Sequence, residues 1–176
     1  MKMEFFDVVK NRCSIRNFQT EKEVPDAILN QILETAIRAP SAGNLQSWDF
    51  IIVTKQEIKE ELVGAALGQR FIAKAPVVIV VCANQIRSAM GYGRRGSELY
   101  CIQDTAAAIQ TMLLTITALG YGACWVGAFR ESAVAAILKT PKEVRPIALI
   151  PIGVPKRIPH PTPRIPLKKI IHYETF

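Results

Sequence analysis

Residues Ser97 to Leu119 form the longest helical pattern in the chain, and this pattern limits the possible folds more than any other segment. Large residues recur in it at helical spacing, namely Tyr100, Met112, Leu113, Ile116 and Leu119. Small or apolar residues occupy nearly all of the remaining positions around the helix. A helix that is apolar all round is buried all round. In a chain of 176 residues, a length typical of one domain, we expect a sheet to cover one side of this helix and a second subunit to cover the other.

The rest of the chain predicts a mixture of strands and shorter helices. Apolar runs predict strands at Phe50–Thr54, Pro76–Ala83, Ala123–Gly127 and Pro146–Val154. The Pro76–Ala83 run is continuous, as expected of a central strand that is buried on both faces. Helical spacing predicts helices at Glu4–Lys10, from Pro25 to a stop at Pro40, at Gln56–Leu67 and at Glu131–Leu138.

Two further segments predict irregular structure. Ile86–Gly96 carries Arg87, Arg94 and Arg95 among glycines, so we expect an anion-binding rim, a mobile lid or a plain solvated loop. The tail from Lys156 to Phe176 has several prolines in its first half, which favours an extended arm over a packed helix. An arm of this length ordinarily reaches a partner, and the obvious partner is a second copy of the chain.

Composition narrows the function classes. The formal net charge of +7 fits nucleic acid or anionic small molecules, but aromatic residues make up only 7% and are not interleaved with the arginines, which disfavours nucleic acid. No apolar signal segment opens the chain, and the longest apolar run, Pro76–Ala83, is too short to cross a bilayer. The four cysteines form no C-x-x-C pair, so we expect reduced thiols, no metal site and a cytoplasmic location.

Arg12–Phe18 presents a candidate anion-binding face. In an extended backbone alternate side chains share a face, so Arg12, Ser14 and Arg16 point one way and Cys13 points the other. Guanidinium groups hold phosphate oxygens more strongly than neutral donors do. We interpret the segment as a clamp for a phosphorylated ligand, although a polar turn with solvated arginines has the same composition.

The segment Pro40–Trp48 combines small residues with the side-chain amides of Asn44 and Gln46. Small residues allow the backbone to approach a flat ligand closely, and each amide is both donor and acceptor. A helix-to-strand loop without a ligand explains the same residues.

The chain lacks the side-chain groups that ordinary hydrolytic or metal catalysis needs. It has no G-x-S-x-G, H-E-x-x-H or Walker motif, and its two histidines both lie in the tail. The Gly91-x-Gly93-x-x-Gly96 spacing has no strand directly before it, Cys13 has no histidine nearby to activate it, and Glu98 and Asp104 are too few for a metal site. An enzyme with this sequence would take its reactive group from a cofactor.

Six motifs in the chain resemble those of the nitroreductase family, whose members are FMN-dependent NAD(P)H oxidoreductases. They occur in the family's order from residue 5 almost to the C-terminus, and they are Arg12-x-Ser14-x-Arg16-x-Phe18, Ala39-Pro40-Ser41-Ala42-Gly43-Asn44-x-Gln46-x-Trp48, Ala75-Pro76, Tyr100-x-Ile102-Gln103-Asp104, Gly120-x-Gly122 with Trp125-Val126-Gly127, and Arg164-x-Pro166-Leu167. The resemblance implies an α+β three-layer sandwich, with a mixed, mostly antiparallel sheet flanked by helices. It also implies one FMN-binding domain over residues 1–176 and a homodimer that exchanges its C-terminal arms, residues 156–176.

The resemblance implies which residues bind FMN. The FMN phosphate would be held by residues that match the family's phosphate-binding positions. These are Arg12 and Ser14, with Cys13 between them, and Arg164 from the arm. Arg16 matches the basic residue near flavin N1 and the C2 carbonyl, where a positive charge favours the anionic reduced flavin.

The remaining implied residues would surround the isoalloxazine ring. Pro40, Ser41, Ala42 and Asn44 match a loop that lines the ring and comes largely from the other subunit. Val126 and Gly127 match backbone donors near flavin N5, and Gln69 matches an amide at the pyrimidine edge.

The implied activity is hydride transfer from NADH or NADPH through flavin N5 to a small acceptor, such as a nitroaromatic compound or a quinone, in a ping-pong sequence without a catalytic side chain. Alternatives are a flavin-fold member that performs reductive dehalogenation or flavin cleavage, a basic nucleic-acid-binding module, and a structural dimer without a cofactor. The acceptor and the choice between NADH and NADPH stay open, although Arg87, Arg94 and Arg95 could favour a 2′-phosphate.

Three residues depart from the family pattern. Ser47 stands where the family usually has proline, Thr162 where some relatives have a second basic phosphate ligand, and Lys168-Lys169 where an acidic pair is more usual. We expect Ser47 to change only the stiffness of the loop. Thr162 reduces the charge around the phosphate, although the remaining charge-assisted bonds are each worth roughly 1.5–3 kcal/mol.

Overall fold

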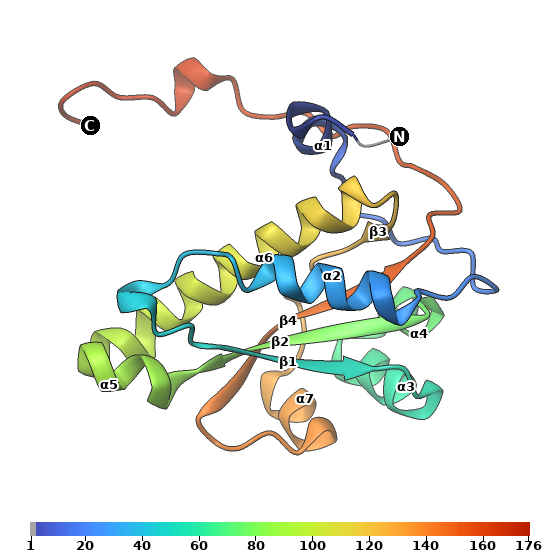
Figure 1. The fold of residues 1–176 in the computed structure, drawn as a ribbon, viewed down its shortest axis with the longest axis horizontal. Helices are drawn as coiled ribbons and strands as arrows, with labels where there is room; N and C mark the ends of the chain where they lie inside the picture. Colours follow the sequence, from blue (N-terminus) through green and yellow to red (C-terminus); the bar gives the residue numbers. More distant parts are fainter. Residues whose placement is uncertain (1–2) are drawn as a thin grey trace.

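The computed structural model describes residues 3–176 as a four-stranded sheet between two layers of helices (Figure 1). The strands are β1 (Trp48–Val53), β2 (Val77–Asn84), β3 (Gly122–Ala123) and β4 (Val144–Gly153), and their order across the sheet is β1-β2-β4-β3. All of these strand pairs are antiparallel, and an isolated parallel bridge joins Ser14 to Ala123. The predicted three-layer α+β sandwich is therefore confirmed.

The helices divide between the two faces of the sheet (Figure 1). Those on one side are α1 (Phe5–Asn11), α2 (Asp26–Ala36) and α6 (Cys101–Ala118), and those on the other are α3 (Gln56–Ala65), α4 (Phe71–Lys74) and α7 (Glu131–Leu138). At one end of the sheet lie α5 (Gln85–Arg95), the π-helical turn η2 (Gly96–Tyr100) and the short 3₁₀ turn η1 (Ala42–Asn44).

Strand β2 separates two apolar cores. Val77, Ile79 and Val81 pack with residues of α2 and α6, whereas Val78 and Val80 pack with residues of α3, α4 and α7. This alternation follows from the two-residue period of a strand. It confirms the prediction that Pro76–Ala83 forms a strand buried on both faces.

Ile150 of β4 tests this packing, because it is fully buried in the core under α6 and pairs in register with Ile79. We expect Ile150→Ala to lower the free energy of unfolding by about 2–5 kcal/mol, since it leaves a cavity in the core. Ile52→Ala, at a position on the edge strand β1 that is 37% exposed, should cost about 1 kcal/mol or less. Urea unfolding measures both, and equal losses would contradict the assigned burial.

The segment 86–96 was predicted as a loop, and that prediction is wrong. Helix α5 begins after Asn84, whose side chain caps it by accepting a hydrogen bond from the Arg87 N–H at 3.0 Å. The helical conformation is interrupted at Gly93, where φ is 51°. The glycines and arginines of this segment obscure its periodicity, and an N-terminal cap and tertiary packing stabilise the helix instead.

The long predicted helix is present, but it begins later than expected, since α6 starts at Cys101 after the turn η2. Its far side is incompletely covered: Gln103 and Gln110 are exposed and Leu114 is half-buried. Cover by a second subunit therefore stays a prediction. The strand predicted at Ala123–Gly127 is reduced to β3 and a single bridge between Val126 and Leu149.

The C-terminal segment after β4 runs along the outside of the molecule, passes near α1 and then extends away from the body (Figure 1). Its only helical element is the 3₁₀ turn η3 (Leu167–Lys169), and residues 156–176 are all exposed. That this segment serves as an arm exchanged between two copies stays a prediction. Across residues 3–176, no helix combines the length and apolar character needed to traverse a lipid bilayer.

Candidate functional site

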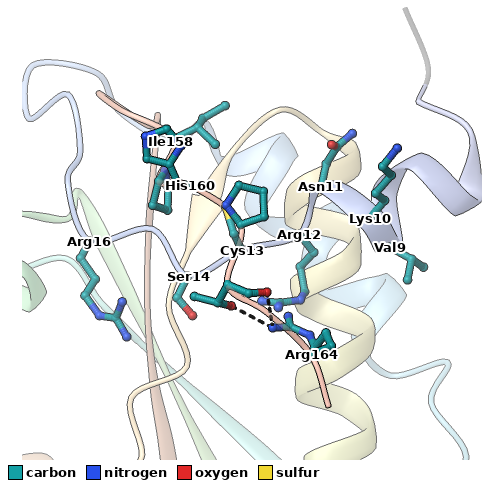
Figure 2. Close-up of a pocket in the computed structure, with 13 residues that line it drawn as sticks. Val9, Lys10, Asn11, Arg12, Cys13, Ser14, Arg16, Ile158, His160 and Arg164 are labelled. Atoms are coloured by element: carbon teal, nitrogen blue, oxygen red, sulfur yellow. Dashed lines mark hydrogen bonds between the residues drawn. The ribbon is translucent and has the colours of Figure 1, made fainter. Parts of the chain in front are cut away.

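The N-terminal segment and the arm together enclose a cavity of about 680 Å³, which Figure 2 shows in close-up. Residues 9–14, Arg16, residues 158–162 and Arg164 line it. The cavity thus joins two parts of the chain that lie at opposite ends of the sequence. Arg12, Cys13, Ser14, Arg16 and Arg164, all predicted to bind a cofactor, lie together here.

Local structure explains how the N-terminal segment presents its side chains. Helix α1 ends at Asn11, and the Arg12 N–H donates to the Val8 carbonyl at 2.9 Å. The chain is then extended, and the Ile15 N–H donates to the Ala123 carbonyl at 2.9 Å. Ile15 is buried against the body, and Arg12 and Ser14 line the cavity, as the alternation of side chains predicts. Cys13 lines the cavity too, although the alternation placed it on the other face.

The cavity is strongly positive. Its basic residues are Lys10, Arg12, Arg16, His160 and Arg164, and no aspartate or glutamate is among the described residues that line it. Arg12 and Arg164 point toward one another (Figure 2). Two guanidinium groups that face each other without a carboxylate between them form a binding site for an anion with several acceptor oxygens.

Thr162 orients Arg164 within this cavity. An Nη1 hydrogen of Arg164 is donated to Thr162 Oγ1 at 2.8 Å and to the Thr162 carbonyl at 3.2 Å (Figure 2). The prediction that threonine at this position only removes a charge is therefore incomplete, because its hydroxyl fixes the neighbouring cation.

A second cavity of about 370 Å³ adjoins the first. Ser14, Arg16 and His160 line both, and Asn17 and Arg157 are added here. No acidic side chain of residues 3–176 lines this second cavity either. The positive surface therefore continues from Arg164 past Arg16, and the Arg16 guanidinium lies 5.8 Å from the centre of the Phe71 ring.

The predicted backbone donors lie on another segment, after β3. The Val126 N–H donates to the Leu149 carbonyl at 3.0 Å, so this amide is used within the sheet. Gly127 is exposed. The Gln69 amide donates to the Ala128 carbonyl at 2.9 Å, which ties Gln69 to the same turn. Of the predicted pair of N–H donors, only Gly127 is left to face a ligand.

The loop at Pro40–Asn44 lies far from the positive cavity. The Ala42 N–H donates to Asp104 Oδ1 at 3.0 Å near the beginning of α6, whereas Ser14 pairs with Ala123 just beyond its end. Because an α-helix rises 1.5 Å per residue, the two ends of α6, and with them Ala42 and Ser14, lie roughly 20 Å apart. Figure 1 shows η1 and α1 at opposite ends of α6. One chain therefore does not bring the loop to Arg12.

Two buried cysteine thiols, Cys82 and Cys124, are not set up as nucleophiles. Burial raises the pKa of Cys124, although the nearby charge of Arg16 acts in the opposite direction. Burial also raises the pKa of Cys82 to about 12. Both thiols are therefore protonated at neutral pH. Within residues 3–176, no three His, Cys, Asp or Glu side chains are grouped to hold a metal ion.

The arginines of the 86–96 segment are engaged within the chain. Arg87 forms an ion pair with Asp49 at 3.0 Å and donates to the carbonyls of Gln46 and Trp48. Arg94 pairs with Glu98, and Arg95 donates to the Tyr100 hydroxyl. The prediction of an anion-binding rim at Arg87 is therefore wrong, because its donors are used to hold the loop before β1.

Sequence reasoning missed three residues that belong to these sites. Lys10 and His160 line the positive cavity, and a signal existed, since Lys10 precedes Arg12 by two positions and His160 precedes Thr162 by two. Asp104 was considered as a metal ligand and as part of a family motif, but not as a partner of the Pro40–Asn44 loop. No local sequence signal connects it to Ala42, because the contact is tertiary.

A comparison with known families decides between the classes that this geometry allows. The model of the nitroreductase family matches residues 9–70 and 65–154. The chain belongs to the nitroreductase family. It is 31% identical to an NADH dehydrogenase of Thermus thermophilus, over 91% of each chain. It is 32% identical to the oxygen-insensitive NADPH nitroreductase of Salmonella typhimurium, over 90% of this chain and 69% of that one.

A solved structure has the same fold. The NADPH:FMN oxidoreductase of Vibrio harveyi, determined in complex with NAD⁺, superposes with a TM-score of 0.89 over 98% of this chain and 77% of that one. The two sequences are 23% identical, so this similarity concerns the fold of the nitroreductase-family chain and not its ligands.

Proposed function

We propose that this protein is an FMN-dependent oxidoreductase that oxidises NADH or NADPH and reduces a small acceptor. The observation that carries the proposal is the meeting of Arg12, Ser14 and Arg164 around a cavity that no described carboxylate lines. A phosphate monoester is the anion that suits two guanidinium groups and a hydroxyl. The cavity of about 680 Å³ lies in the size range of cofactor sites.

The donor set also fits the rest of FMN. Arg12, Ser14 and Arg164 would hold the phosphate, and Arg16, between the two cavities, would place its charge near the pyrimidine edge of the ring. The exposed Gly127 would offer its backbone N–H near flavin N5. Gln69 donates its amide N–H groups to the Ala66 and Ala128 carbonyls, so only its amide oxygen would face the pyrimidine edge. We retain Cys13 and Val126 as wall residues, Val126 without its N–H as a donor.

A second copy of the chain would complete the site. Within one chain, the loop residues predicted to line the ring lie roughly 20 Å from Arg12; they are Pro40, Ser41, Ala42 and Asn44. For this loop to contact the ring, it must come from the second copy. The arm leaves large apolar side chains uncovered, including Leu167 at 68% and Ile165 at 65% exposure. Exposed apolar surface of this kind marks an interface.

Bound FMN would accept hydride from the reduced nicotinamide and would then reduce a second molecule. We propose nitroaromatic compounds and quinones as the class of this second molecule. The protein's own residues bind and orient the cofactor, and the positive charge of Arg16 stabilises negative charge on the pyrimidine ring. If both substrates use one face of the ring, the kinetics are ping-pong.

The purified protein tests this proposal through its visible absorption. We expect a yellow protein, or one that becomes yellow on titration with FMN, and bleaching on addition of NADH or NADPH without air. A protein that takes up no FMN would contradict the proposal. A flavin-loaded protein that does not turn over NAD(P)H with a quinone would favour the alternative flavin chemistries, dehalogenation or flavin cleavage.

A further inference from the structure

The loop between α2 and β1 has an unusual backbone. Gly43, Asn44 and Gln46 have φ values of 57°, 56° and 50°, in the left-handed region that residues other than glycine rarely adopt. A Cβ at Gly43 would lie 2.9 Å from the Tyr92 hydroxyl, so the Tyr92 side chain would have to shift to make room for it. Such a conformation persists only where neighbouring groups hold it.

Asp104 of α6 holds both ends of this loop. Its Oδ1 accepts from the Ala42 N–H at 3.0 Å, and its Oδ2 accepts from the Ser47 hydroxyl at 2.7 Å. Ser47 is completely buried and Asp104 is 5% exposed. No basic side chain of residues 3–176 forms an ion pair with Asp104. These two neutral donors therefore compensate a buried carboxylate.

Arg87 holds the same loop from its outer side. Its guanidinium donates to the Gln46 carbonyl at 2.8 Å and to the Trp48 carbonyl at 3.0 Å. The loop is thus fixed between a buried anion on α6 and a half-exposed cation on α5. Asp104 and Arg87 therefore hold the seven-residue segment 41–47 from opposite sides. Two such contacts on so short a segment indicate that they fix the conformation of its backbone.

We propose that Asp104 is a positioning residue, which uses the Ser47 hydroxyl as its buried donor to fix the 41–47 loop in the shape that receives the isoalloxazine ring of FMN. The inference rests on the proposed function and deepens it. Ser47 stands where proline is usual in the family, and proline has no hydroxyl. In this chain a hydrogen bond replaces the stiffness of a proline ring, so the expectation that Ser47 changes only stiffness is corrected.

The test compares the affinities of the full-length protein for FMN and for riboflavin, which lacks the phosphate. Ser47→Ala removes the donor to Asp104 with little change in volume. We expect it to weaken binding of both flavins about tenfold, because the loop is disordered by the loss of a charge-assisted bond. The ratio of the two affinities should stay unchanged, since the loop faces the ring and not the phosphate.

Thr105→Val is the matched control. Thr105 is also completely buried on α6, but its hydroxyl bonds only to the Cys101 and Ile102 carbonyls of its own helix, each at 2.9 Å. This variant should lose thermal stability without losing flavin affinity. Asp104→Leu removes both anchors and should weaken both flavins about 100-fold, provided that circular dichroism shows it folded.

Three results would overturn the inference while leaving the proposed function intact: unchanged flavin affinity in Ser47→Ala, an equal loss in Thr105→Val, or a loss for FMN without one for riboflavin. Absence of flavin binding in the unmodified protein is a different outcome, because it removes the proposed function and this inference together.

Discussion

Replacing Arg12 by alanine is expected to weaken FMN binding by about 10- to 100-fold, because it removes one of the two guanidinium groups that face each other across the positive cavity. The remaining affinity should depend less steeply on salt concentration than that of the unmodified protein, since one charge contact fewer is made. Fluorescence titration at several salt concentrations measures both quantities.

Two controls separate a lost phosphate contact from a general effect of charge. Riboflavin has no phosphate, so Arg12→Ala should change its affinity by less than about threefold. Lys22→Ala removes the same charge from an exposed position that lines neither cavity, and it should leave FMN binding as it is. An equal loss for riboflavin, or an unchanged FMN affinity in Arg12→Ala, would show that the phosphate site is elsewhere.

The double variant Leu167→Asp with Ile170→Asp is expected to separate the two copies of the chain. Both side chains are more than half exposed on the arm, at 68% and 56%. In a dimer, contact with the second copy would cover these apolar side chains. Two carboxylates in such an interface should raise the dissociation constant of the dimer at least about 100-fold. Flavin should be lost as well, because the partner's loop no longer reaches the ring.

Analytical ultracentrifugation over a range of protein concentrations measures this change. Lys168→Asp is the control, since it places the same carboxylate in the same turn η3 but replaces a residue that is already charged. A double variant that stays dimeric and retains flavin would show that the arm is not the element that joins the copies.

Several elements of this fold could be predicted because their sequences specify them locally. The continuous apolar run of β2 can be buried on both faces only if helices cover both sides of the sheet. The helix predicted at Glu131–Leu138 has the same bounds as α7. The alternation of Arg12, Ser14 and Arg16 also needs only an extended backbone. Each of these features depends on neighbours in the sequence, so the pattern contains the necessary information.

Other features depend on distant contacts, and the sequence does not contain them in readable form. Helix α5 has glycines inside it and is stabilised by the Asn84 cap and by packing against the loop before β1. The Val126 N–H is occupied by Leu149 because two segments far apart in the sequence pair. The role of Asp104 needs the knowledge that α6 passes beside Ala42, which only the folded chain provides.

Mixed dimers test the central claim most directly, namely that two chains build each flavin site. One chain would carry Arg12→Ala, and the other Ala42→Trp, which fills the space at the ring loop; two affinity tags isolate the mixed dimer after co-expression. If the site is shared, both changes fall in one site and the other stays intact, so the mixed dimer should bind about half the FMN of the unmodified protein. If the mixed dimer binds no more FMN than either variant does by itself, each site lies within one chain, and the account is contradicted.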